Sequence, residues 1–286
     1  MFVIVGYILV IGSVLGGFLM AGGHLHVLWQ PVELIIIGGA AIGGFIVSNT
    51  NKVLKAVGKG LASCFKNTAV TREFYMSLMA LMYEVLTKVR KEGLMSIEGD
   101  VEEPEQSPLF QKYPDVLADH HIIEFMTDYL RLMVSGNLNP MEIEALMDGE
   151  LETHHQEAHT PASAVQKMAD GLPAFGIVAA VMGVVHVMGS VGQVSNAELG
   201  NMIAAALVGT FLGILLSYGF VGPLASLLEQ KISESSKPFE CVKTTLLASL
   251  NGYSPALSVE FGRKVLYSTE RPTFLELESH VKGTKG

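Results

Sequence analysis

Residues 199–228 read LGNMIAAALVGTFLGILLSYGFVGPLASLL and contain no Asp, Glu, Lys or Arg. A helix of about 20 residues crosses a hydrocarbon core of ~30 Å, so this run is long enough to span a bilayer. Residues 1–32 and 171–197 are also free of charge. With 49% hydrophobic and 16% charged residues overall, the composition is more apolar than that of an ordinary soluble protein. The chain is therefore predicted to be an all-α integral membrane protein.

Four transmembrane helices are predicted from the apolar runs. The first run lacks the basic flank and the small-residue cleavage site of a signal peptide, so it is kept as a span. The second run has Glu33 near its start. The predicted spans are Phe2–Ala21, Pro31–Thr50, Leu172–Ser190 and Leu199–Leu228.

The distribution of basic residues predicts the orientation. Of the 19 Lys and Arg residues, 11 lie between Lys52 and Lys167, 8 lie between Lys231 and Lys285, and none lies in the loops 22–30 and 191–198. Loops rich in Lys and Arg stay on the cytoplasmic side, so both basic regions and both termini are expected there. The predicted parts are spans 1 and 2 (1–50), a helical cytoplasmic domain (51–170), spans 3 and 4 (171–228) and a helical cytoplasmic tail (229–286).

Several helix starts are expected in the cytoplasmic part. Thr71 is placed to cap an amphipathic helix, and Asn139 followed by Pro140 has the pattern of a cap and a first-turn proline. Thr160 and Pro161 repeat that pattern, which predicts a new helix leading toward span 3.

Two charged stretches are interpreted from their composition. Asn51–Lys66 has lysines among apolar residues and is predicted to lie as a helix on an anionic membrane surface, which makes membrane lipid a partner. Glu98–Glu105 is acidic and contains Pro104, so it is predicted to be a solvated loop. The net charge of −9 and the absence of a basic stripe argue against binding to nucleic acid.

Spans 3 and 4 are rich in small residues, which allow helices in lipid to approach closely. One interpretation is packing within the subunit, and the other is a tight seat for a transmembrane helix of a partner. The small residues are Gly176, Ala179, Ala180, Gly183, Ala204, Ala205, Ala206, Gly209 and Gly213.

Prolines and ionisable groups set limits on the chemistry of these two spans. Pro173 opens span 3, either as a first-turn proline or as a kink, and Pro223 is expected to kink span 4. A proton path through lipid normally requires an ionisable residue, and His186 is the only such group in the two spans. The titratable acid is therefore expected from another chain. Span 3 has no hydroxyl before Ser190, which favours protons over sodium because sodium requires several oxygen ligands.

Long motifs resemble those of the A subunits of flagellar stators, a family that includes MotA, PomA and LafT. They are ALVGTFLG (206–213) followed by Pro223, the opening GYILVIGSVLGGFLMAGG (6–23), and NGYSPALSVEFGRKVLYSTERPTF (251–274). The resemblance covers nearly the whole chain. The lateral-flagellum LafT type is not separable from the MotA type on these motifs.

The resemblance implies a stator subunit in the bacterial inner membrane, without a cofactor and without enzymatic activity. Five A subunits would surround a dimer of MotB-type B subunits, whose aspartate carries protons, and the cytoplasmic domain would push on the rotor protein FliG. Arg90 and Glu98 match the rotor-contact positions. Ala180 stands where sodium-type members have a threonine, as expected for a proton type. The residues implied to lie along the ion path or to face the partner are Pro173, Ala180, Thr210, Tyr218 and Pro223.

Other functions fit the sequence less well. An energiser of the ExbB/TolQ type typically has three spans, whereas four are predicted here, and a membrane scaffold without ion flow is the alternative from another class. No nucleophile elbow, Walker loop or metal triad is present, which argues against an enzyme. His155 and His159 could share a helix face, but without a third ligand they do not indicate a metal site.

Overall fold

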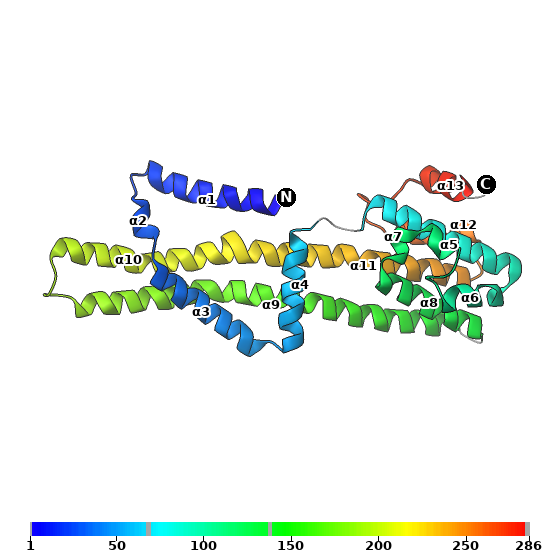
Figure 1. Ribbon diagram of the computed structural model, residues 1–286, viewed down its shortest axis with the longest axis horizontal. Coiled ribbons are helices and arrows are strands. Elements are labelled where there is room, and N and C mark those ends of the chain that lie inside the picture. The colour runs from blue at the N-terminus through cyan, green and yellow to red at the C-terminus, as the bar shows by residue number, and fades with distance from the viewer. Residues whose placement is uncertain (1, 67–69, 137–138, 284–286) are drawn as a thin grey trace. The chain divides into compact units, whose positions relative to one another are not determined.

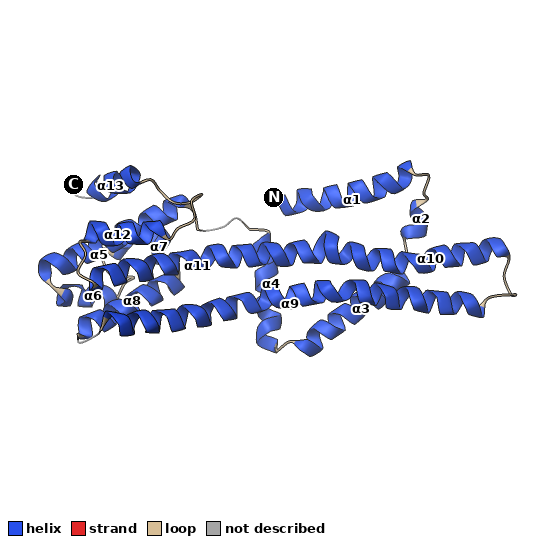
Figure 2. Ribbon diagram, turned by 180° about the vertical axis from the view of Figure 1, so that it is seen from behind, coloured by secondary structure: helices blue, strands red, loops and turns tan. Residues whose placement is uncertain are grey.

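The computed structural model describes residues 2–66, 70–136 and 139–283, and every regular element in these ranges is helical (Figures 1 and 2). Four of the described helices are long and apolar enough to cross a membrane. The predicted all-α class with four apolar spans is confirmed.

The chain divides into two compact units, each built from two separate stretches. The unit that contains the apolar helices comprises residues 1–67 and 157–231, and we call it the span unit. The other comprises residues 68–156 and 232–286, and we call it the head unit. Two long helices, α9 (Pro140–Gly189) and α11 (Gly222–Leu250), contribute residues to both.

The first two spans agree with their predicted limits, because their apolar runs end at turn residues. The helix that follows span 2 begins at Asn51, as expected. Besides parts of α9 and α11, the span unit contains α1 (Phe2–Met20), α2 (Leu25–Leu28), α3 (Pro31–Ser48), α4 (Asn51–Cys64), α10 (Asn196–Ile214) and a π-helical segment, η3 (Leu215–Val221).

Span 3 is the end of a much longer helix. α9 begins at Pro140 and runs through Pro161 and Pro173 without a break, so the predicted helix start at Thr160 is wrong. A proline inside a helix removes one backbone hydrogen bond. Here the neighbouring Ala164 and Val165 are buried against α4 and α11, and this packing outweighs the local signal for a new helix.

Span 4 also continues well beyond the apolar run. Ser195 caps α10 by accepting a hydrogen bond from the N–H of Glu198 at 3.2 Å, and the helical path then extends without interruption to Leu250. The predicted span Leu199–Leu228 is therefore one part of a longer helical stretch.

Small apolar clusters hold the span unit together. One joins α3 to α9 through Ile37, Ala41, Leu172 and Ala179. Figures 1 and 2 show α4 crossing α9 and α11, where a second cluster forms around buried Val57. α1 has no buried residue; many of its apolar side chains are exposed, while Tyr7 and Val10 are half-buried.

The head unit is a helical domain with a larger core. Side chains that are completely buried there include Leu78, Ile97, Phe110, Val116 and Leu130. Besides parts of α9 and α11, it contains α5 (Arg72–Glu92), η1 (Leu94–Ile97), α6 (Glu98–Glu102), η2 (Phe110–Lys112), α7 (Pro114–Leu117), α8 (His120–Ser135), α12 (Pro255–Lys264) and α13 (Phe274–Gly283).

Two of the predicted helix starts are confirmed. The Thr71 hydroxyl accepts a hydrogen bond from the N–H of Phe74 at 3.3 Å, and the Asn139 side chain accepts one from the N–H of Met141 at 3.1 Å. Gly93 ends α5 with φ at 87°, a backbone conformation that favours glycine.

The predicted loop over Glu98–Glu105 is wrong in its first half. Residues 98–102 form α6, because Ile97 and Val101, spaced four apart, are buried at 0% and 1% exposure on one side of this short helix. Glu98 and Glu102 remain exposed, whereas the Asp100 side chain turns inward and pairs with Lys88 at 2.7 Å.

Candidate functional site

A seam of glycine and alanine joins α9 to α10 in an antiparallel register. A Cβ placed on Gly213 would lie 2.7 Å from the Cα of Gly176 and 2.7 Å from the carbonyl of Leu172. A Cβ on Gly183 would lie 2.7 Å from the Cβ of Ala206. The two helices therefore touch backbone to backbone.

This seam accounts for part of the set of small residues. Gly209 belongs to it as well, since a Cβ there would lie 3.0 Å from the backbone nitrogen of Ala180. These residues pack within the subunit, as the first interpretation holds. The larger side chains of Ile177, Val181 and Leu207 point away from the seam and are 56%, 56% and 60% exposed. These three exposed side chains are available for contact with lipid or with another chain.

Span 2 contains an acid with a buried oxygen atom that the sequence did not single out. Glu33 lies in the first turn of α3, and its Oε2 atom is buried without a hydrogen-bond partner. Sequence reasoning noted Glu33 only as an interruption of the apolar run. A single acid within an apolar span was the signal that could have identified it.

A kink was expected at Pro223, and the structure has a π-helical segment, η3, that ends at Val221, two residues before the proline. In η3 the backbone pairing shifts by one residue, and the N–H of Gly222 reaches the carbonyl of Ser217. Pro223 comes next and has no N–H to donate. Short π-helical segments inside α-helices occur frequently at functional sites.

A groove of about 190 Å³ runs between this segment and α1. Tyr218, which is 72% exposed, and the exposed Pro223 lie along it. The lining residues are Val3, Gly6, Tyr7 and Val10 from α1, and Tyr218, Gly219, Pro223, Leu224 and Leu227 from the other side.

The five predicted ion-path residues therefore fall into two groups. Ala180 is only 8% exposed, and Pro173 and Thr210 are half-buried beside the same seam. Tyr218 and Pro223 instead line the groove against α1. His186 is exposed near the far end of α9.

In the head unit, the predicted rotor-contact residues lie on both sides of Gly93. Arg90 and Glu98 are both exposed, and the Arg90 guanidinium donates a long hydrogen bond of 3.4 Å to the carbonyl of Tyr253. Glu98 borders a shallow cavity of about 170 Å³ that Arg131 also lines. Arg131 was missed from the sequence, because only the packing of α6 against α8 brings it beside Glu98.

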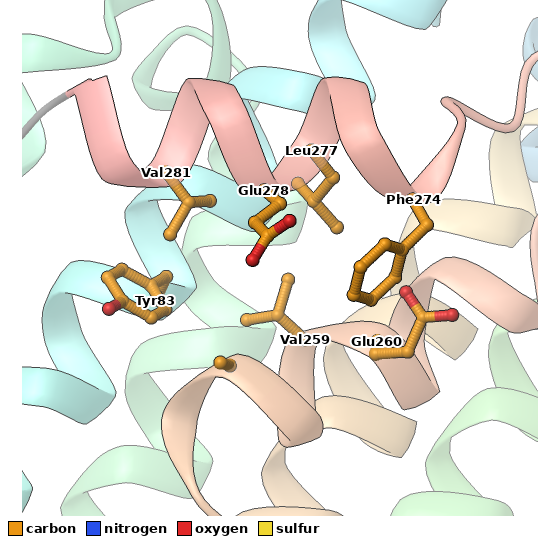
Figure 3. Close-up of a pocket in the computed structure, with 8 residues that line it drawn as sticks. Tyr83, Val259, Glu260, Phe274, Leu277, Glu278 and Val281 are labelled. Carbon is orange, nitrogen blue, oxygen red and sulfur yellow. The ribbon is translucent and has the colours of Figure 1, made fainter.

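The C-terminal helix α13 covers an apolar cavity of about 90 Å³ (Figure 3). Phe274, Leu277 and Val281 of α13 point toward Val259 and Tyr83 in that view. At its edge the Arg263 guanidinium donates hydrogen bonds of 2.7 and 2.6 Å to Glu260. These bonds hold the pKa of Glu260 below its usual value.

The described residues contain neither a disulfide nor a cluster of side chains that could bind a metal ion. Cys64 and Cys241 are both free and buried, and burial raises the pKa of the Cys241 thiol to about 12. Over the described ranges, no group of three or more His, Cys, Asp and Glu side chains is arranged to hold a metal ion.

Comparisons with known proteins place this geometry in a family. Residues 4–93 match the model "Motility protein A N-terminal", and residues 118–241 match the "MotA/TolQ/ExbB proton channel family". Motility protein A of Salmonella typhimurium and of Escherichia coli are each 54% identical over 285 residues, covering 100% of this chain and 96% of theirs. Chemotaxis protein LafT of Vibrio parahaemolyticus is 38% identical over 281 residues, covering 98% of both chains.

Solved structures share the fold. The MotAB structure of C. jejuni superposes with a TM-score of 0.76 at 20% identity, covering 93% of this chain and 95% of that chain. The flagellar MotAB stator complex of Bacillus subtilis gives 0.68 at 23% identity, covering 90% and 92%. Full-length similarity to sequences 54% identical establishes that the chain belongs to the motility protein A family, within the broader MotA/TolQ/ExbB proton channel family.

Proposed function

We propose that this chain is the A-type stator subunit of a bacterial flagellar motor and forms a proton channel together with a MotB-type partner. The observation that supports this most directly is the α9–α10 pair, whose seam is made of glycine and alanine and whose charge-free runs contain only His186 as an ionisable group. Proton transfer across lipid requires a titratable group. A partner helix bearing a carboxylate would complete the path.

The resemblance to solved MotAB complexes supports the same assembly. We propose a homopentamer of this chain around a dimer of the partner. In it, Pro173, Ala180 and Thr210 would lie close to the partner's carboxylate. Tyr218 and Pro223 would adjust the bend of span 4 as protons bind and leave. The absence of a hydroxyl at Ala180 fits a proton path better than a sodium site.

The proposed membrane placement has both termini and the head unit in the cytoplasm of a bacterial inner membrane. The location of all 19 Lys and Arg outside the short loops between the spans supports it. α4 would then lie at the cytoplasmic surface of the bilayer. Lys55 and Lys59 are exposed on it, and their charge suits contact with anionic lipid headgroups.

The head unit is proposed to push on the rotor protein FliG through Arg90 and Glu98. Both side chains are exposed, and opposite charges on a rotor surface would attract them over about one Debye length. One elementary charge that crosses 100 mV releases ~2.3 kcal/mol, so torque would accumulate over many small steps.

The test is proton leak into vesicles that contain this chain with a MotB-type partner lacking its channel plug. We expect a leak from the pair, and none from either chain alone or from a pair whose partner aspartate is changed to asparagine. A leak from this chain alone would contradict the proposal, as would the absence of a leak from the pair when both chains are present in the vesicle. Replacing external sodium with potassium should leave the leak unchanged.

A further inference from the structure

We propose that Tyr7 in α1 is a positioning residue for the π-helical segment in span 4. Its hydroxyl donates a hydrogen bond to a backbone carbonyl in the segment where Pro223 removes a backbone donor. Tyr7 thereby fastens the first span to the π-helical segment, so α1 is more than a membrane anchor.

Around Pro223 the backbone has fewer N–H donors than carbonyl acceptors. The last π-type bond runs from the N–H of Gly222 to the carbonyl of Ser217. α11 then resumes α-helical pairing, in which position 225 bonds back to position 221. The carbonyls at positions 218, 219 and 220 are left with a single backbone donor, at position 224, because Pro223 has no N–H.

Tyr7 reaches one of these three carbonyls. Its hydroxyl donates to the carbonyl of Phe220 at 3.0 Å, and the two rings pack with centroids 5.0 Å apart. Contact between the helices is close here, since a Cβ on Gly219 would lie 3.1 Å from the side chain of Val10. In a hydrocarbon environment no water replaces a missing donor, so a donor from a neighbouring helix is the available solution.

The other hydroxyl of α1 serves as a comparison. Ser13 donates to the carbonyl of Val10 in its own helix at 3.1 Å, as serines in helices commonly do. Tyr7 instead directs its hydroxyl to a different element. Tyr7 and the exposed Pro223 line the same groove, so the hydrogen bond lies at the edge of an opening beside the π-helical segment.

Hydrogen–deuterium exchange of residues 214–228, in the assembled complex in lipid nanodiscs, tests the hydrogen bond. Loss of one hydrogen bond should make exchange in Tyr7→Phe about two- to tenfold faster, whereas Ser13→Ala should exchange like the wild type. Pro223→Ala puts a backbone donor back. In that background Tyr7→Phe should have less than half of its original effect. Unchanged exchange in Tyr7→Phe, or an equal effect in both backgrounds, would overturn the inference.

A second measurement, the rotation speed of single motors, rests on the proposed function. It distinguishes a positioning role of Tyr7 from a role in the stability of the complex alone. In single motors at low load, Tyr7→Phe should lower the speed per stator complex by about a third or more, without changing the number of complexes that engage. An unchanged speed per complex with fewer complexes would mean that Tyr7 serves only assembly. Failure of the wild-type chain to support rotation would contradict the proposed function, while the exchange result would still decide the inference about Tyr7.

Discussion

Replacing Gly213 with alanine should separate α9 from α10. The new Cβ would lie 2.7 Å from the Cα of Gly176 and 2.7 Å from the carbonyl of Leu172. Both neighbours are backbone atoms, so no side-chain rotation relieves the contact. Carbon atoms pack best at 3.5–4.0 Å, so the helices must part by ~1 Å, and a gap of that size forfeits up to half of the contact energy along the seam. Overpacking of this kind costs about 1–3 kcal/mol.

The assay is thermal unfolding of the purified complex. The quantity measured at each temperature is the fraction of the complex that remains assembled. At about 2–4 °C per kcal/mol for a protein of this size class, the midpoint should fall by several degrees, and swimming should slow. Gly200→Ala is the matched control, because Gly200 lies on the same helix and a Cβ there meets nothing within 4 Å. Equal midpoints for the two variants would refute the backbone-to-backbone seam.

A compensating pair sharpens this test. Gly183→Ala brings two Cβ atoms to 2.7 Å, because Ala206 lies opposite. Adding Ala206→Gly removes that contact and leaves one of 3.0 Å to the Cα. The double variant should therefore recover part of the lost stability, and a double variant less stable than Gly183→Ala would contradict the register.

Four further outcomes concern the head unit. Thr71→Ala should lower the free energy of unfolding by ~1 kcal/mol through loss of the helix cap, with Thr71→Ser close to wild type in thermal unfolding. Gly93→Ala should cost ~1–3 kcal/mol in the same measurement, because φ there is 87°, and an unchanged midpoint would contradict that backbone. The hydrogen bonds from Arg263 lower the pKa of Glu260, so their stabilisation is present above the usual value of 4.5 and is lost as the pH falls below it. Unfolding midpoints should therefore decline more steeply below that pH in the wild type than in Glu260→Gln. Cys241 is fully buried with a pKa of about 12, so it should resist maleimide labelling in the native complex and react only after denaturation.

Structural features that depend on one local interaction could be predicted from the sequence. The helix start at Thr71 was predicted correctly because a capping hydroxyl acts within one turn. The start at Thr160 was predicted on the same grounds and was wrong, because burial of Ala164 and Val165 against other helices outweighs a local cap. Residues 98–102 were misread for a related reason, since the anchoring contacts of Ile97 and Val101 come from distant segments.

In the candidate site, too, the sequence identified the residue types, whereas their contacts appeared only in the structure. Composition identified the small residues of spans 3 and 4 but left open whether they pack within the subunit or against a partner. The seam in the structure answers this for Gly176, Gly209 and Gly213. Neither Arg131 beside Glu98 nor Tyr7 beside Phe220 was visible in the sequence, because each pair is separated along the chain and meets only after the helices pack.

By itself, the sequence determined the all-helical class and the four apolar spans. Each follows from the free energy of placing charge and unpaired backbone groups in lipid, which depends on residue type and run length alone. Only the tertiary structure decided the register of α9 against α10, the π-helical segment before Pro223 and the donor that Tyr7 supplies to it. These depend on contacts of about 3 Å between distant residues, which no local pattern encodes.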